Sequence, residues 1–180
     1  MNDVLEVIKE RRSIRNFEDR DVDDKLVEKV LEALRWAPSW ANTQCWEVVV
    51  IRDPEVRAAV GEAMPKANPA SKAVKSAPVL LALCGRLNTS GFYKGLKATK
   101  FGDWFMFDLG IAAQNIMLAA HAVGLGTVVA GLFDQDAVAR AVNLPDGYEL
   151  LALFPMGFAS KVPSAPKRKT LSEFIHYDRF

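Results

Sequence analysis

Three arginines and a serine lie close together near the N-terminus, in the run Arg11-Arg12-Ser13-Ile14-Arg15. Guanidinium groups form charge-assisted, often bidentate hydrogen bonds to phosphate, and a serine hydroxyl adds a neutral donor. If the preceding helix continued through this run, Arg11 and Arg15 would share a face, where like charges repel. A bound phosphate would turn that repulsion into attraction. The alternative is a solvated basic helix end, which the helix dipole favours.

A second candidate is the loop from Pro38 to Trp46, with the sequence PSWANTQCW. Short polar side chains stand between two tryptophans, a composition that suits a loop able to offer hydroxyl and amide groups to a cofactor. The same residues also suit a plain connection whose ends are fixed by the aromatic side chains. The residues alone leave both interpretations open.

The elements that must position these residues include one long apolar stretch, Asp103–Gly126. Fifteen residues without formal charge separate Asp108 from Gly124, and apolar side chains fall on nearly every face of a helical wheel. We therefore predict a long, buried central helix, capped by Asp103 and ended by Gly124, in contact with a partner subunit. Gln114, Asn115 and His121 interrupt the run, which argues against a membrane span.

The remaining pattern predicts strands alternating with helices, which indicates an α+β domain with a mixed sheet surrounded by helices. A short N-terminal helix should turn Val4, Leu5 and Ile8 inward. Residues 85–102 exceed a usual connection and predict a mobile active-site cover or a disordered loop. The apolar tail within residues 159–180 should dock on the body or on another subunit. The predicted helices are 21–36, 53–63 and 134–142, and the predicted strands are 47–52, 78–84, 127–130 and 148–158.

Composition restricts the class of protein. The chain has 180 residues, half of them apolar, and a net charge of +1, which predicts one domain over residues 1–180 without a nucleic-acid or membrane partner. The N-terminus lacks the apolar core of a signal peptide, so we expect a cytoplasmic protein. Cys45 and Cys84 are far apart and predict reduced thiols, and two histidines do not suggest a metal centre.

Known nucleotide and hydrolase motifs are missing from the sequence. Gly124-Leu125-Gly126 is followed by a predicted strand, whereas the dinucleotide fingerprint needs a strand before its glycines and a helix after them. The sequence has no P-loop, no serine nucleophile elbow and no HExxH. A nucleotide cofactor would therefore have to bind in another way.

Four segments together resemble the flavin-dependent nitroreductase family. They are RRSIRNF at 11–17, PSWANTQCW at 38–46, DLGIAAQNIMLAAHAVGLGT at 108–127 and PKRKTLSEFI at 166–175. Their order and their spread over nearly the whole chain make the resemblance specific. It differs in having Trp40 where many relatives carry a serine, Cys45 where they carry a proline, and Val128–Gly131 where they place a proline and a glutamate.

The resemblance implies an α+β homodimer that binds FMN at each of two subunit interfaces. One group of residues would hold the phosphate, ribityl chain and pyrimidine edge, a second group would reach the partner's flavin, and a third would lie along the isoalloxazine ring. These groups are, in turn, Arg11, Arg12, Ser13, Arg15 and Arg168; Pro38, Ser39, Trp40 and Asn42; and Val129, Ala130 and Gly131. No side chain is nominated as a catalytic acid or base, because the flavin carries the chemistry.

The implied activity is an oxidoreductase that passes hydride from NAD(P)H through FMN to a nitroaromatic, a quinone or a similar small electron acceptor in a two-step cycle. Within the same fold the alternatives are reductive dehalogenation and enone reduction. Outside enzymology they are a flavin-holding or regulatory dimer with little turnover, and an interaction module without a cofactor.

Overall fold

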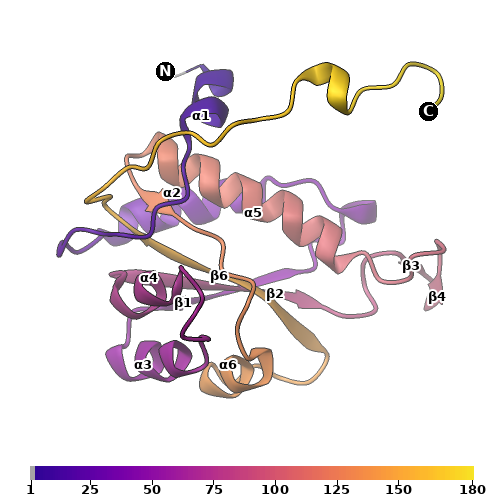
Figure 1. The fold of residues 1–180 in the computed structure, drawn as a ribbon. Coiled ribbons are helices and arrows are strands. Elements are labelled where there is room, and N and C mark those ends of the chain that lie inside the picture. The colour runs from indigo at the N-terminus through magenta and orange to yellow at the C-terminus, as the bar shows by residue number, and fades with distance from the viewer. Residues whose placement is uncertain (1–2) are drawn as a thin grey trace.

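A four-stranded antiparallel sheet forms the centre of the computed structural model, which describes residues 3–180 (Figure 1). Its spatial order is β1 (Trp46–Ile51), β2 (Val79–Arg86), β6 (Tyr148–Gly157) and β5 (Gly126–Thr127). β2 pairs with β6 over its whole length and with β1 over residues 80–85, and the register of the β2–β6 pair shifts between Leu83 and Cys84. The long apolar runs in the sequence have therefore become the central strands.

Helices cover both faces of the sheet. α2 (Asp24–Arg35) and α5 (Phe105–Ala122) lie on one face, and α3 (Pro54–Glu62), α4 (Ser71–Ser76) and α6 (Gln135–Ala141) lie on the other (Figure 1). Helices surrounding a sheet confirm the predicted α+β class. The pairings between named strands within residues 3–180 are all antiparallel, and an isolated parallel bridge joins Ser13 to Thr127.

β2 shows how the sequence divides between the two layers, because successive side chains of a strand point to opposite faces. Leu81 and Leu83 belong to the core beneath α2 and α5, whereas Leu80 and Ala82 belong to the core beneath α3, α4 and α6. All four are fully buried. A strand buried on both faces reads as an unbroken apolar run, as this one does in the sequence.

The long helix forms where it was predicted, but the single chain does not bury it on every side. Asp103 accepts a hydrogen bond from the N–H of Phe105 at 3.1 Å, and Gly124 takes the left-handed conformation (φ 84°) after the helix ends. Leu109, Ala112 and Ile116 are fully buried, while Met106 and Phe107 are 60% and 59% exposed. The prediction of burial all round is therefore wrong for one copy of the chain.

Two local features differ from the elements predicted from the sequence. The sequence analysis assigned no helix to residues 65–76, but this segment ends in the short helix α4, which has no side-chain cap. The third strand is shorter than predicted and spans only Gly126–Thr127, with a separate bridge at Ala130.

The long segment 85–102 is folded rather than disordered. It contains a hairpin of β3 (Phe92–Tyr93) and β4 (Leu96–Lys97). Its turn residues Lys94 and Gly95 both have positive φ, the conformation of a tight hairpin turn.

The two ends of the chain lie on the same side as α5 and expose apolar side chains (Figure 1). α1 (Val4–Glu10) buries Val7 but exposes Val4, Leu5 and Ile8, so the prediction that these three face inward is wrong for the single chain. Every residue from 160 to 180 is exposed, and the tail does not dock on the body of its own chain. Within residues 3–180 no helix has the length and apolarity needed to cross a membrane.

Candidate functional site

The arginine-rich run near the N-terminus is extended, not helical. α1 ends at Glu10, and Arg11 already has extended backbone angles. The N–H of Ile14 donates to the carbonyl oxygen of Thr127 at 2.9 Å, within a parallel bridge between Ser13 and Thr127. The conditional arrangement of Arg11 and Arg15 on one helical face is therefore wrong, because pairing with the sheet edge straightens the chain.

The same segment also holds the C-terminal part of the chain. The N–H of Glu18 donates to the carbonyl of Phe158 at 2.9 Å, and the N–H of Ser160 donates to the carbonyl of Asn16 at 3.1 Å. Arg20 stacks over the Phe158 ring, 3.8 Å from its centroid. The residues that follow Ser160 are thus led past the arginine-rich run.

Gly126 allows the close approach on which this arrangement depends. A Cβ at Gly126 would lie 2.5 Å from the side chain of Ile14, which is buried. No side chain other than hydrogen fits there unless the arginine-bearing segment moves. The second glycine of Gly124-Leu125-Gly126 is thus required by the packing of Ile14 against β5.

Four arginines from opposite ends of the chain line one cavity of about 320 Å³, which we call the arginine cleft. Arg11, Arg12, Ser13 and Arg15 form one wall. The other wall is formed by Arg168 with its neighbours Pro163, Ser164 and Pro166. The structure therefore brings together all five residues that the family resemblance assigned to the phosphate, the ribityl chain and the pyrimidine edge.

The positive charge of the arginine cleft is not neutralised by carboxylates. None of the ion pairs within residues 3–180 includes Arg11, Arg12, Arg15 or Arg168. Partial burial, together with the positive charges of Arg12 and Arg168, lowers the pKa of Arg11. Guanidinium groups held together in this way favour an anion between them.

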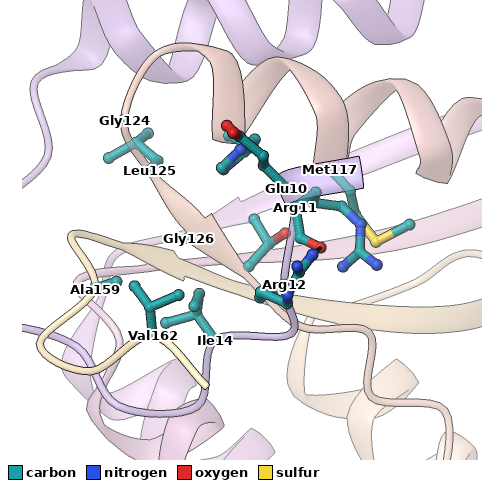
Figure 2. A pocket seen from close by; sticks show the side chains of 12 residues that line it. Glu10, Arg11, Arg12, Ile14, Met117, Gly124, Leu125, Gly126, Ala159 and Val162 are labelled. Atoms are coloured by element: carbon teal, nitrogen blue, oxygen red, sulfur yellow. Dashed lines mark hydrogen bonds between the residues drawn. The ribbon is translucent and has the colours of Figure 1, made fainter. Parts of the chain in front are cut away.

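A smaller cavity of about 200 Å³ adjoins the arginine cleft, and Figure 2 shows it between the end of α1, α5 and β5. Arg11 and Arg12 line both cavities. Met117 and Leu125 give the smaller cavity an apolar wall, and His121 also lines it. Sequence reasoning did not identify Met117 or His121 as neighbours of the arginines. Their only signal was their place in the last turns of the long helix.

The loop at 38–44 lies at the other end of α5. The N–H of Trp40 donates to Asp108 near the start of α5 at 3.0 Å, whereas the cavity beside the arginines reaches α5 at His121. Thirteen residues of helix separate Asp108 from His121, a distance of about 20 Å. Pro38 and Asn42 line a separate open cleft. One copy of the chain thus does not bring Pro38, Ser39, Trp40 and Asn42 into the arginine cleft.

The third predicted group, Val129–Gly131, lies at the sheet edge after β5. The N–H of Ala130 donates to the carbonyl of Leu153 at 2.9 Å, so this amide is occupied within the sheet. Within the described part of the chain, the N–H groups of Val129 and Gly131 have no hydrogen-bond partner. Val129 is 44% exposed, and a ligand could reach these two amides.

Comparison with known proteins identifies the family to which this fold belongs. Residues 8–158 match the model of the nitroreductase family, and the chain belongs to that family. The archaeal relative from Methanothermobacter thermautotrophicus named "Putative NADH dehydrogenase/NAD(P)H nitroreductase" is 33% identical over 165 residues, which cover 89% of this chain and 80% of the relative. These findings confirm the family that the four sequence segments predicted.

Two further comparisons place the chain among flavin-related proteins and solved folds. The FMN reductase [NAD(P)H] of Bacillus subtilis is 29% identical over 143 residues, which cover 73% of this chain and 55% of the relative. The crystal structure of a nitroreductase family protein from Clostridium difficile superposes with a TM-score of 0.84 at 30% identity, and all of both chains is covered. The sheet and its helices are therefore those of the family.

Proposed function

We propose that this protein is an FMN-dependent NAD(P)H oxidoreductase that reduces a nitroaromatic, a quinone or a similar small acceptor in a two-step, ping-pong cycle. The observation that carries the proposal is the arginine cleft, where guanidinium groups from both ends of the chain meet without carboxylate partners. Family membership and the names of the relatives, which include an FMN reductase and an NAD(P)H nitroreductase, point to the same chemistry.

The residues of the arginine cleft fit the phosphate end of FMN. A phosphate monoester carries roughly 1.5 to 2 negative charges at neutral pH, which would balance much of the charge gathered here. Arg11, Arg12 and Arg168 would hold the phosphate, Ser13 would donate to the ribityl chain, and Arg15 would place positive charge at the pyrimidine edge. When bound, FMN supplies the hydride transfer that no side chain of the protein can perform.

The Val129–Gly131 segment would lie along the ring, with the N–H groups of Val129 and Gly131 as its donors. Ala130 would act differently from its two neighbours, because its N–H is bound to Leu153. The buried side chain of Ala130 would instead hold residues 129–131 at a fixed distance from the sheet. In this proposal NAD(P)H and the acceptor use one site in turn, which agrees with the absence of a dinucleotide fingerprint from the sequence.

A second copy of the chain would complete the site. Pro38, Ser39, Trp40 and Asn42 lie about 20 Å along α5 from the arginines of their own chain, so we assign them to the flavin of the partner. The apolar surface needed for a dimer is present on the same side of the molecule, on α1, α5 and the C-terminal tail. Its large exposed side chains include Leu5, Met106, Phe107, Leu171 and Phe174.

The proposal is tested first by colour and then by reduction. Purified protein incubated with FMN and desalted should retain a yellow flavin spectrum, and anaerobic NADH or NADPH should bleach it. A nitroaromatic or a quinone should then restore the colour without NAD(P)H present. Protein that stays colourless after incubation would refute the cofactor assignment, and coloured protein that does not bleach would indicate a flavin holder instead of an enzyme.

A further inference from the structure

A buried carboxylate near the start of α5 has no positively charged partner. Asp108 is 1% exposed, and within residues 3–180 it forms no ion pair. A carboxylate withdrawn from water is tolerated only where hydrogen-bond donors replace its hydration. The groups that donate to Asp108 therefore show what this residue holds in place.

The donors come from two segments that are far apart in the sequence. Ser90 donates its hydroxyl to Oδ2 of Asp108 at 2.6 Å, and the backbone N–H of Trp40 donates to Oδ1 at 3.0 Å. The Cys45 thiol lies 3.7 Å from Oδ2. Burial, followed by the charge of Asp108, raises the pKa of Cys45 to about 12, so this thiol stays protonated and acts as a donor.

The first segment is the Trp40 loop, which we define as residues 39–44. Ala41, Asn42 and Gln44 all have left-handed backbone angles, with φ of 47°, 56° and 48°. Non-glycine residues in this conformation are strained and persist only where the surroundings determine them. The N–H of Gln44 donates to Ser39 Oγ at 2.9 Å inside the loop, and the Trp40–Asp108 bond ties the loop to the helix.

The second segment is the root of the β3–β4 hairpin. Ser90 is fully buried, and its carbonyl accepts a hydrogen bond from the N–H of Trp104 at 3.0 Å. The indole N–H of Trp104 donates to Thr99 Oγ1 at 2.6 Å, which closes the other side of the hairpin. The hairpin lies beyond the N-terminal end of α5 (Figure 1). The position of the hairpin relative to α5 therefore depends on where Ser90 is held.

We propose that Asp108 is a positioning residue that ties the Trp40 loop to the root of the β3–β4 hairpin, so that FMN bound against the loop also fixes the hairpin. This inference rests on the proposed function, in which the Trp40 loop contacts the cofactor of the partner subunit. In this proposal Asp108 and Ser90 connect the cofactor to the β3–β4 hairpin. Binding of FMN then sets the position of the hairpin, although the hairpin contributes no residue to the arginine cleft.

Limited trypsin digestion can measure this link, because Lys94, Lys97 and Lys100 in the hairpin are all exposed. The full-length protein, with and without FMN, is digested briefly, and mass spectrometry follows cleavage after each lysine. FMN should slow hairpin cleavage several-fold in the parent, since cleavage follows the population of opened segments. In Ser90→Ala, which should retain FMN after desalting, hairpin cleavage should be equally fast with and without FMN.

The control variant is Thr89→Ala, because the Thr89 hydroxyl donates only to the nearby carbonyl of Leu87 at 3.1 Å. It should show the parent's response to FMN. Asp108→Asn should also keep that response, since the amide oxygen can accept from Trp40 N–H while the amide N–H donates to the Ser90 hydroxyl. If Ser90 had only a structural role, Ser90→Ala would be cleaved faster throughout the chain, and FMN would still slow cleavage of the hairpin.

Each remaining outcome decides the question. Ser90→Ala that keeps the FMN-dependent slowing overturns the inference, as does a parent that retains FMN without any slowing. A parent that does not retain FMN refutes the proposed function itself. If Ser90→Ala does not fold, hydrogen exchange of the parent decides: FMN should protect peptides covering both 38–45 and 88–100, and protection of the first alone overturns the link.

Discussion

Removing either Arg11 or Arg168 should loosen FMN without weakening the fold. These two arginines come from opposite ends of the chain and line the same cleft, and Arg168 is one of the charges that lower the pKa of Arg11. Replacing either with alanine removes a charge-assisted contact to phosphate, and it also removes a repulsion that exists in the protein without cofactor. The first change weakens FMN binding, whereas the second stabilises the cofactor-free protein. A general loss of structure would instead weaken both.

The magnitude follows from the contact. A hydrogen bond to a charged group contributes about 1.5–3 kcal/mol, which corresponds to a roughly 10- to 150-fold rise in Kd. Arg11 is half-buried, so the rise in Kd for Arg11→Ala should lie near the upper end of that range. Arg168 is exposed and more strongly screened by solvent, so Arg168→Ala should fall toward the lower end.

Quenching of flavin fluorescence on titration gives the Kd, and thermal unfolding of the cofactor-free protein gives the stability. Arg140→Ala is the matched control, because Arg140 is exposed on α6, on the opposite face of the sheet. The control should leave both quantities unchanged, and the cofactor-free form of Arg168→Ala should melt no lower than the parent. If Arg11→Ala and Arg168→Ala bind FMN as tightly as Arg140→Ala, the phosphate assignment is wrong.

The packing leads to four further predictions. Gly126→Ala should lower the free energy of unfolding by about 1–3 kcal/mol and weaken FMN retention, because the added Cβ collides with Ile14; urea titration and desalting would show an unaffected protein if this is wrong. Phe107→Glu should convert a dimer into a folded monomer that retains little FMN, and light scattering that still shows the dimer would contradict the interface. Burial raises the pKa of Cys45 to about 12 and of Cys84 to about 11, so both should resist a thiol reagent at about pH 8 in the native state. The unfolded chain loses these thiol protons from about pH 9 upward, whereas the native chain keeps them. The free energy of unfolding should therefore fall as the pH rises from about 9 toward 11. The fall should be smaller in the variant with both cysteines replaced by alanine.

Local sequence signals were sufficient to predict a helix or strand wherever that element depends on its own residues. Asp53 and Asp134 were expected to begin helices, and each accepts a hydrogen bond from a backbone N–H of the helix it caps. Residues 79–85 of β2 carry no polar side chain other than the Cys84 thiol, because both faces of this part of the strand are covered. By contrast, α4 lacks a side-chain cap and has only six residues, so its sequence carries no signal of comparable strength.

The errors concern contacts between distant parts of the chain. Arg11 ends a helix because the next residues pair with Thr127, more than a hundred positions away in the sequence, and nothing within 11–15 indicates that pairing. Val4, Leu5 and Phe107 are apolar, yet they are exposed in the single chain. An apolar side chain indicates that a residue tends to be buried, but it does not say whether its own chain or a second copy covers it.

The sequence by itself determined the chemical groups and the family: arginines able to bind a phosphate, a polar loop between tryptophans, and a long apolar helix in the order typical of nitroreductases. Only the tertiary structure showed which backbone pairings bring Arg168 beside Arg11, and that the Trp40 loop lies at the far end of α5. The physical reason is that composition and periodicity act over a few residues, whereas the cleft is formed by backbone pairing between segments near opposite ends of the chain.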